Sequence, residues 1–288
     1  MAKGFFVTGT DTGVGKTVIT AALIKAVRLL GFRACGMKPV ETGCKRVQSS
    51  EFGVTHKFIN NDTSKLSICH AGLDPASSSS LDSRFRGNDN EYEFIDKPFD
   101  KRTELLPADG MFLREMADMD DSIDLITSIR FENPLAPLSA SEIEGVSVDF
   151  SKIQKAYADL SKNYNAVIVE GIGGLLVPIK KDYFVLDLAR DFGLPVIVVS
   201  RPGLGTLNHT MLTVNYAIRE GLHVAGIIIN HSRPPEDTIA EDTNPGIIRQ
   251  ISPIPIIGIF PYLEDLQSST IEKAAAKNLN IEIIKKYL

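Results

Sequence analysis

The chain contains 288 residues and carries a formal net charge of −5. This length allows one large α/β domain or two ordinary ones. The mildly acidic balance argues against nucleic acid or an anionic membrane as a partner, because either partner favours a concentrated basic face. The three cysteines form no C-x-x-C pair and no metal-ligand spacing, which favours a reducing compartment. With no signal-peptide pattern and no apolar stretch of bilayer length, we expect a cytoplasmic protein.

A glycine-rich loop separates the first predicted strand, residues 4–8, from the first predicted helix, residues 18–30. It reads Gly9-Thr-Asp-Thr-Gly-Val-Gly15-Lys16-Thr17. Glycines let backbone N–H groups turn toward one anion, and the helix N-terminus adds the positive end of its dipole. Lys16 then reaches the terminal phosphates, and the Thr17 hydroxyl can bind Mg²⁺. The spacing of the outer glycines is one residue longer than usual, so we interpret the loop as a variant P-loop; a glycine-rich turn without nucleotide is the alternative.

The rest of the chain alternates short β-branched runs with helical patterns. We expect further strands at residues 34–38, 166–170, 195–200, 224–230 and 254–259, and helices at 111–117, 150–161, 207–219, 245–251 and 271–277. Such alternation predicts a single α/β domain of the P-loop NTPase type, with a mostly parallel sheet and helices on both faces. Ligands of these sheets bind at the carboxyl ends of the strands. The residues that follow each strand are therefore the candidates for a site.

Residues 46–101 interrupt this alternation. They include Asp-Pro, four consecutive serines and Arg-Phe-Arg-Gly-Asn-Asp. Such a polar, turn-rich composition buries too little apolar area to offset the entropy cost of ordering it. We interpret residues 47–101 as a surface insertion in one domain that spans residues 1–288. A lid or a partner-binding loop is the alternative, since long loops are often functional.

Lys38 and Thr42 lie in the run Lys-Pro-Val-Glu-Thr-Gly that follows the second strand. A lone lysine at a strand end usually extends into solvent. The predicted sheet would place Lys38 beside Lys16, however, and two neighbouring ammonium groups favour a bound anion between them. Thr42 would add a hydroxyl at this point, although it also fits an ordinary turn.

Two acidic residues are candidates for metal binding. Glu170 ends a buried strand and precedes a glycine loop, which is where P-loop enzymes place an acid that holds the metal. A cap on the following segment is the alternative for Glu170. Asp109 precedes the predicted helix at residues 111–117, so spacing alone explains it as an acid favoured by the helix dipole.

Asn230 ends another predicted strand, and its side-chain amide can pair with a purine edge as both donor and acceptor. An ordinary turn asparagine is the alternative. His209 and His231 lie near strand ends as well. No nucleophile pattern such as G-x-S-x-G accompanies them, so we assign neither histidine a catalytic role.

Five motifs in this order resemble those of the dethiobiotin synthetases, the ATP-dependent carboxylases of biotin synthesis. They are Gly-Thr-Asp-Thr-x-Val-Gly-Lys-Thr, Lys-Pro-Val-x-Thr-Gly, Val-Glu-Gly-x-Gly-Gly, Gly203-Leu-Gly-Thr-Leu-Asn-His209 and Asn230-x-x-x-Pro-Pro. The resemblance covers the chain outside residues 46–101. One departure lies in the loop, where some members of the family have glutamate and this chain has Gly13.

The resemblance implies a site and a reaction. The reaction joins CO₂, 7,8-diaminononanoate and ATP with the help of Mg²⁺, through a carbamate and a carbamic-phosphoric mixed anhydride. The resemblance implies that Lys16, Lys38 and Thr42 catalyse this reaction. It also implies a homodimer whose active sites lie at the interface between the subunits. The resemblance implies that the ATP phosphates bind at Thr12, Gly13, Val14, Gly15, Lys16, Thr17 and Val18. It implies that adenine binds at Asn230, Pro261, Tyr262 and Leu263, and Mg²⁺ at Thr17, Asp109 and Glu170. The diamine and carbamate would lie at Thr12, Lys38 and Thr42, and the substrate carboxylate would bind Gly205, Thr206, Leu207 and Asn208 of the neighbouring subunit.

Two rival interpretations share a similar loop. Amidases of the cobyrinic acid type need a glutamine-hydrolysing domain with a cysteine nucleophile, whereas all cysteines here lie within the first 69 residues. Regulatory ATPase switches of the partitioning or division-site type carry a signature lysine in the loop, where this chain has Asp11. The switch interpretation remains the alternative to the synthetase.

Overall fold

The computed structural model of the protein describes residues 3–48 and 103–288. Its centre is a six-stranded sheet with the strand order β12-β11-β10-β1-β7-β2, in which all neighbours run parallel. The strands are β1 (Lys3–Gly9), β2 (Ala34–Met37), β7 (Ala166–Glu170), β10 (Val196–Ser200), β11 (Val224–Asn230) and β12 (Ile256–Phe260). The expected parallel α/β sheet is thus confirmed.

Nearly every residue of these strands is buried, as a sheet covered on both faces requires. Phe5, Phe6 and Val7 of the central strand β1 are fully buried. In register, Phe5 lies opposite Ile168 of β7 and Val7 lies opposite Ile197 of β10. The apolar runs that predicted the strands therefore form one continuous core.

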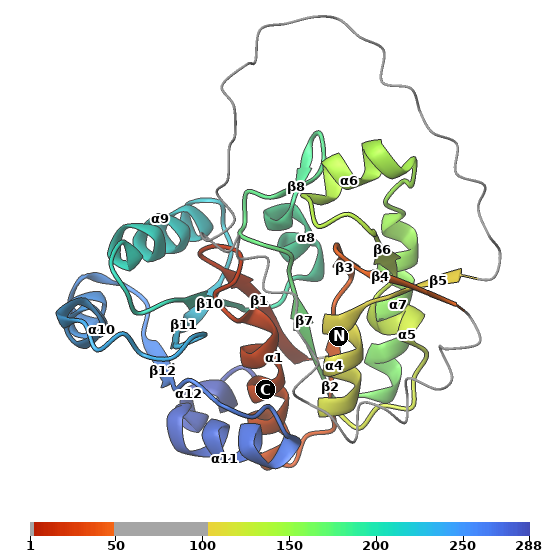
Figure 1. Cartoon of the computed structure of the whole chain (residues 1–288). Coiled ribbons are helices and arrows are strands. Elements are labelled where there is room, and N and C mark those ends of the chain that lie inside the picture. The colour runs from red at the N-terminus through yellow and green to blue at the C-terminus, as the bar shows by residue number, and fades with distance from the viewer. Residues whose placement is uncertain (1–2, 49–102) are drawn as a thin grey trace, which may run out of the picture.

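Helices cover the two faces of the sheet (Figure 1). They are α1 (Lys16–Leu29), α4 (Ala108–Met116), α5 (Ile123–Ile126), α6 (Pro137–Glu144), α7 (Phe150–Asn163), α8 (Val185–Phe192), α9 (Thr206–Arg219), α10 (Ile239–Ile251), α11 (Ser268–Asn278) and α12 (Ile281–Lys285). The chain crosses the sheet from β1 to β2 in one direction and returns through β7, β10 and β11 to β12 in the other. Because such crossovers are right-handed, α1 covers one face and α7 to α10 the other. Helices α4, α11 and α12 contact α1 and complete its layer.

Helix α10 corrects one expectation from the sequence. We expected a helix over residues 245–251. It begins at Ile239 instead, and Pro245 lies inside it. The Thr238 side chain accepts a hydrogen bond from the backbone N–H of Glu241 at 3.3 Å and caps the earlier start. The interior proline removes one hydrogen bond of the helix, and the burial of Asn244, Pro245 and Ile248 helps to keep the segment in place.

Three small ladders were not predicted. Strand β3 (Val40–Glu41) pairs in parallel with β6 (Ile129–Arg130), and β8 (Pro178–Lys180) pairs with β9 (Tyr183–Phe184). Strand β4 (Lys45–Gln48) pairs antiparallel with β5 (Thr103–Leu106), so that residue 48 lies opposite residue 103. The first two residues assigned to the insertion, at 47 and 48, thus belong to a strand. The remainder of that predicted insertion lies outside the described residues.

Candidate functional site

The glycine-rich loop connects β1 to α1 at the carboxyl edge of the sheet. Gly13 and Gly15 adopt left-handed backbone conformations, with φ of 74° and 83°, that favour glycine. Gly15 also caps the N-terminus of α1. The side chain of Val14 is fully buried, so the loop is fastened to the core between its two glycines. This is the strand, loop and helix arrangement that binds phosphate with backbone N–H groups.

Lys16 lies in the first turn of α1 and is only 7% exposed. Its Nζ donates to the backbone oxygen of Asp11 at 3.1 Å across the loop. Burial, and next the charge of Lys38, lower the pKa of Lys16 to about 8. An anion placed between the two lysines would reverse this effect, because it favours the charged form of both.

Lys38 lies directly after β2 and is 4% exposed, so it does not extend into solvent. Its Nζ lies 2.6 Å from Glu170 Oε1 and 3.2 Å from Asp109 Oδ2, and it donates to the backbone oxygen of Gly171 at 3.3 Å. Burial alone would lower the pKa of Lys38, but the two carboxylates outweigh burial and raise the pKa above its ordinary value. Lys38 is therefore a fixed positive charge at the centre of the site.

Glu170 brings the phosphate loop and Lys38 together. Its Oε1 accepts hydrogen bonds from Thr17 Oγ1 at 3.0 Å and from Lys38 Nζ at 2.6 Å. Residue 170 is 1% exposed, and its second oxygen, Oε2, has no hydrogen-bond partner. The carboxylate does not act as a helix cap; it lies between the loop and the second strand.

The oxygen atoms of this cluster fit Mg²⁺. Thr17, Glu170 and Asp109 supply a hydroxyl and two carboxylates, and Glu170 Oε2 is a buried oxygen that lacks a partner. Among the described residues no three acidic, histidine or cysteine side chains lie close enough to hold a metal by themselves. Magnesium usually binds through one or two carboxylates together with substrate phosphates, so this partial set of ligands suits an ion that arrives with a nucleotide.

Glu41 belongs to the same cluster, although no pattern in the sequence pointed to it. Its carboxylate accepts hydrogen bonds from the backbone N–H groups of Asp109 at 2.9 Å and Gly110 at 3.0 Å. Burial, and next the charge of Asp109, raise the pKa of Glu41 to about 8. The only sequence signal is its position inside the Lys38 motif, between Val40 and Thr42. Thr42 itself is half-buried directly after β3.

Asn230 is the last residue of β11 and is buried. Its Nδ2 donates to the backbone oxygen of Val14 at 2.8 Å, and Ser232 Oγ donates to that of Gly13 at 3.0 Å. The two hydrogen bonds support the phosphate loop, which is a further role for Asn230 beside the purine contact that remains a prediction. The other residues expected near adenine, Pro261 to Leu263, follow β12 at the same edge of the sheet.

The turn expected to bind the substrate carboxylate leads into α9. Gly205 caps this helix with φ of 90° and without a capping side chain. Asn244 of α10 supports the turn, since its Nδ2 donates to the backbone oxygens of Pro202 at 2.8 Å and Gly203 at 3.1 Å. Leu204, which lies between Gly203 and Gly205 in the turn, is 92% exposed. The helix N-terminus therefore faces outward beside an exposed apolar side chain.

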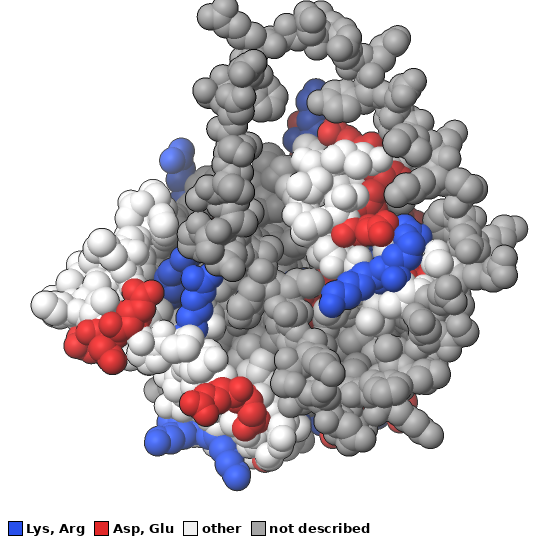
Figure 2. All heavy atoms as spheres, in the orientation of Figure 1, with Lys and Arg blue, Asp and Glu red and all other residues white. Residues whose placement is uncertain are grey.

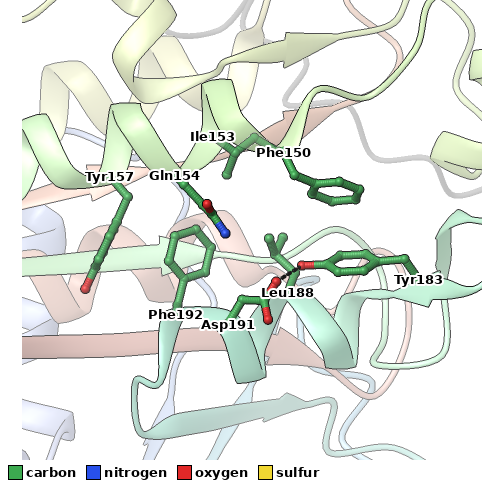
Figure 3. A pocket seen from close by; sticks show the side chains of 8 residues that line it. All are labelled: Phe150, Ile153, Gln154, Tyr157, Tyr183, Leu188, Asp191 and Phe192. Carbon is green, nitrogen blue, oxygen red and sulfur yellow. Dashed lines mark hydrogen bonds between the residues drawn. The ribbon is translucent and has the colours of Figure 1, made fainter.

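A hollow of about 100 Å³ lies between α7, α8 and β9, where Phe150, Tyr157, Tyr183 and Phe192 form much of the wall (Figure 3). Tyr183 Oη donates to Asp191 Oδ2 at 2.5 Å at its rim. None of its lining residues was predicted to bind substrate, nucleotide or metal. It is separate from the cluster around Lys38.

The charges that the described residues place on the visible surface do not mark a second binding site (Figure 2). On the face in Figure 2, acidic and basic side chains of the described residues lie interspersed. In the part of the chain that is described, no helix has the length and apolar character needed to cross a bilayer.

The chain is similar to several known proteins. A family model described as an AAA domain matches residues 3–95 and 94–270. A protein of Thermodesulfovibrio yellowstonii named ATP-dependent dethiobiotin synthetase BioD is 40% identical over 291 residues, which is 99% of each chain. A protein of Bacillus licheniformis with the same name is 32% identical over 284 residues, 98% of this chain and 95% of the relative. Among solved structures, a ParA family ATPase of Chlorobium tepidum aligns with 99% of this chain and 97% of its own, with 14% identity and a TM-score of 0.45.

Proposed function

The chain belongs to the family of ATP-dependent dethiobiotin synthetases, and we propose that it carboxylates 7,8-diaminononanoate with CO₂ and closes the ring to dethiobiotin while it converts ATP to ADP and phosphate. The observation that carries the proposal is the place of Lys38. It is a buried ammonium group between Asp109 and Glu170, beside Lys16 of the phosphate loop. A charged pair of lysines at this point suits a reaction in which negative charge gathers around a transferred phosphoryl group.

The chemistry needs charge neutralisation and alignment, and no covalent intermediate with the protein. One amine of the substrate adds to CO₂ and loses a proton, which gives a carbamate. The carbamate oxygen attacks the γ-phosphorus, ADP leaves, and the second amine then closes the ring as phosphate departs. Lys16 would hold the β- and γ-phosphates, Lys38 would offset charge on the transferred group, and Thr42 would orient the carbamate. Mg²⁺ held by Thr17, Asp109 and Glu170 would offset further phosphate charge.

The nucleotide would lie along the carboxyl edge of the sheet. Residues 12–18 would bind its phosphates with backbone N–H groups. Asn230 and residues 261–263 would lie near the adenine, with Asn230 also supporting the loop through its bond to Val14. This arrangement is supported by the common edge at which β1, β11 and β12 end.

A second copy of this chain would complete the substrate site. The N-terminus of α9, with residues 205–208, faces outward and suits a carboxylate. Leu204, Leu212 and Ile218 on the turn and helix are exposed apolar side chains, which suit contact with another subunit. We therefore propose a homodimer in which this turn binds the carboxylate of a substrate held by the other subunit.

Release of ADP with and without diamine and bicarbonate tests the function directly. ADP should appear only when both are present, together with a product of the mass of dethiobiotin. ATP turnover that is independent of the diamine would contradict the synthetase and favour a regulatory ATPase.

A further inference from the structure

We propose that Glu41 is a positioning residue that places Asp109 in the metal site by holding the first turn of α4. The inference rests on the proposed function, in which Asp109 helps to bind Mg²⁺. It concerns the residue between Val40 and Thr42 in the Lys38 motif, to which neither the reaction nor the resemblance assigns a role.

The two carboxylate oxygens of Glu41 accept hydrogen bonds from two successive backbone N–H groups. Oε1 accepts from the N–H of Asp109 at 2.9 Å, and Oε2 accepts from the N–H of Gly110 at 3.0 Å. The first N–H groups of a helix have no partner within the helix. The N-cap of α4 is Pro107, which offers no capping side chain. A carboxylate from a distant strand therefore caps α4 and satisfies both donors.

Glu41 is itself held firmly. It lies in β3, opposite Arg130 of β6, and its backbone oxygen accepts from the N–H of Phe131 at 2.9 Å. Two residues earlier, the oxygen of Pro39 accepts from the N–H of Ile129 at 3.0 Å. The same short segment begins with Lys38. The position of the cap is thus tied to the position of the lysine that Asp109 contacts.

The other side of the turn is closed by Thr127. A Cβ added at Gly110 would lie 2.0 Å from Thr127 Oγ1, so the backbone of the turn lies directly against that hydroxyl. Contacts with Glu41 on one side and Thr127 on the other leave the first turn of α4 little freedom to shift. They hold Asp109 where its Oδ2 lies 3.2 Å from Lys38 Nζ.

The choice of a carboxylate has an electrostatic cost here. Glu41 is 5% exposed, and burial together with the charge of Asp109 opposes its ionisation. A serine or threonine at the N-cap would cap the helix without that cost. A hydroxyl does not offer two oxygens in the plane needed to hold two successive N–H groups. We therefore attribute the presence of a glutamate at position 41 to its ability to accept both hydrogen bonds.

A double-mutant cycle on metal binding tests the inference. Binding of Mn²⁺ in the presence of ADP, measured by electron paramagnetic resonance, is compared in the wild type, Glu41→Ala, Asp109→Ala and the double variant. Glu41→Ala should bind Mn²⁺ roughly 10-fold more weakly, the loss typical when a partner of a metal ligand is removed, and Asp109→Ala, which removes the ligand itself, should lose at least as much. The double variant should bind no more weakly than Asp109→Ala, because Glu41 acts through that residue.

Two further variants separate positioning from general stability. Asp149→Ala removes a carboxylate cap from α7, where Asp149 Oδ1 accepts from the N–H of Ser151 at 2.9 Å. It should lower the Tm without changing Mn²⁺ affinity. Glu41→Gln keeps one acceptor oxygen and should lie between wild type and Glu41→Ala, which also provides a result if the alanine variant folds poorly.

The outcomes separate the inference from the proposed function. If Asp109→Ala binds Mn²⁺ normally, the metal assignment of the proposed function is wrong, and the inference loses its basis. If Asp109→Ala is weakened but both Glu41 variants bind normally, the inference alone is overturned. Additive losses in the double variant would also overturn it, because Glu41 would then act independently of Asp109.

Discussion

The side-chain amide of Asn230 occupies the space into which a Cβ at residue 15 would project. Such a Cβ would lie 2.2 Å from Asn230 Nδ2, and this nitrogen donates to the oxygen of Val14 at 2.8 Å. Residue 15 must therefore be glycine for two reasons: its backbone is left-handed, and any side chain would collide with Asn230, the last residue of β11.

Asn230→Ala should weaken binding of ATP and of inorganic tripolyphosphate alike, because it removes support from the loop that holds phosphates. Removal of one buried hydrogen bond costs about 1–3 kcal/mol. If the whole cost falls on ligand binding, the dissociation constant of each ligand should rise roughly 5- to 150-fold. Calorimetry with both ligands measures it. A variant that loses ATP affinity but binds tripolyphosphate normally would place Asn230 at the base alone.

Lys16→Ala and Lys38→Ala should both abolish dethiobiotin formation but differ in nucleotide binding. Lys16 would contact ATP itself, so its variant should bind ATP weakly. Lys38 would act on charge that develops during transfer, so its variant should keep ATP affinity and lose turnover by roughly 100-fold or more. Equilibrium binding of a fluorescent ATP analogue, with folding checked by circular dichroism, distinguishes the two. Equal losses of affinity would contradict separate roles.

Residues 49–102 should be dispensable for folding and activity. Gln48 and Thr103 lie opposite each other in the β4–β5 ladder, so an Asn-Gly turn can close the hairpin in their place. The shortened chain should remain monodisperse and keep its kcat. A shortened chain that aggregates, or that folds but shows no turnover, would assign the deleted residues a structural or catalytic role.

Gly205→Val should raise the KM for the diamine and leave ATP binding nearly unchanged. Valine is strained at φ of 90°, and its branched side chain would crowd the N-terminus of α9. Mixing this variant with Lys16→Ala should restore activity, because heterodimers with composite sites would carry both defects in one site and none in the other. A mixture shown by mass to contain heterodimers but without recovered activity would place the turn in its own subunit's site.

Cys35 and Cys44 should resist alkylation in the folded protein. Both are buried, and burial raises the pKa of each thiol above its ordinary value. A raised pKa means less thiolate at pH 8, and the thiolate is the reactive form. Peptide mass mapping after iodoacetamide treatment should find both residues unmodified until denaturant is added. Rapid labelling of either residue in native buffer would contradict the packing around it.

Buried parallel strands could be predicted from the sequence, because burial on both faces requires continuous apolar runs. Strands β7 and β11 begin and end where they were predicted. Helix α10 was predicted too short, because its first turns, which begin after the cap at Thr238, show no clear apolar periodicity. The two-residue ladder of β3 and β6 leaves no pattern, since its pairing depends on neighbours in space.

The candidate site shows the same division. Lys16, Lys38 and Glu170 could be selected because each lies at the end of a predicted strand or in the loop that follows one, and the structure brings them together. Glu41 could not, because its function depends on backbone groups 68 and 69 residues further along the chain. A side chain that binds a distant backbone carries no signal in its own neighbourhood. The bond from Asn230 to the backbone oxygen of Val14 could not be predicted either, because it joins residues 216 positions apart.

The central place of β1 delays the folding of the protein on the ribosome. Its hydrogen-bonding partners are β7 and β10, which end at residues 170 and 200. At about 5–20 residues per second, the ribosome needs roughly 10–40 s to supply both. Throughout that interval Phe5, Phe6 and Val7 have no sheet in which to be buried. The segment that later forms the middle of the core therefore stays exposed on the nascent chain until β10 has been made, and a chaperone that binds apolar segments during this interval should raise the yield of folded protein.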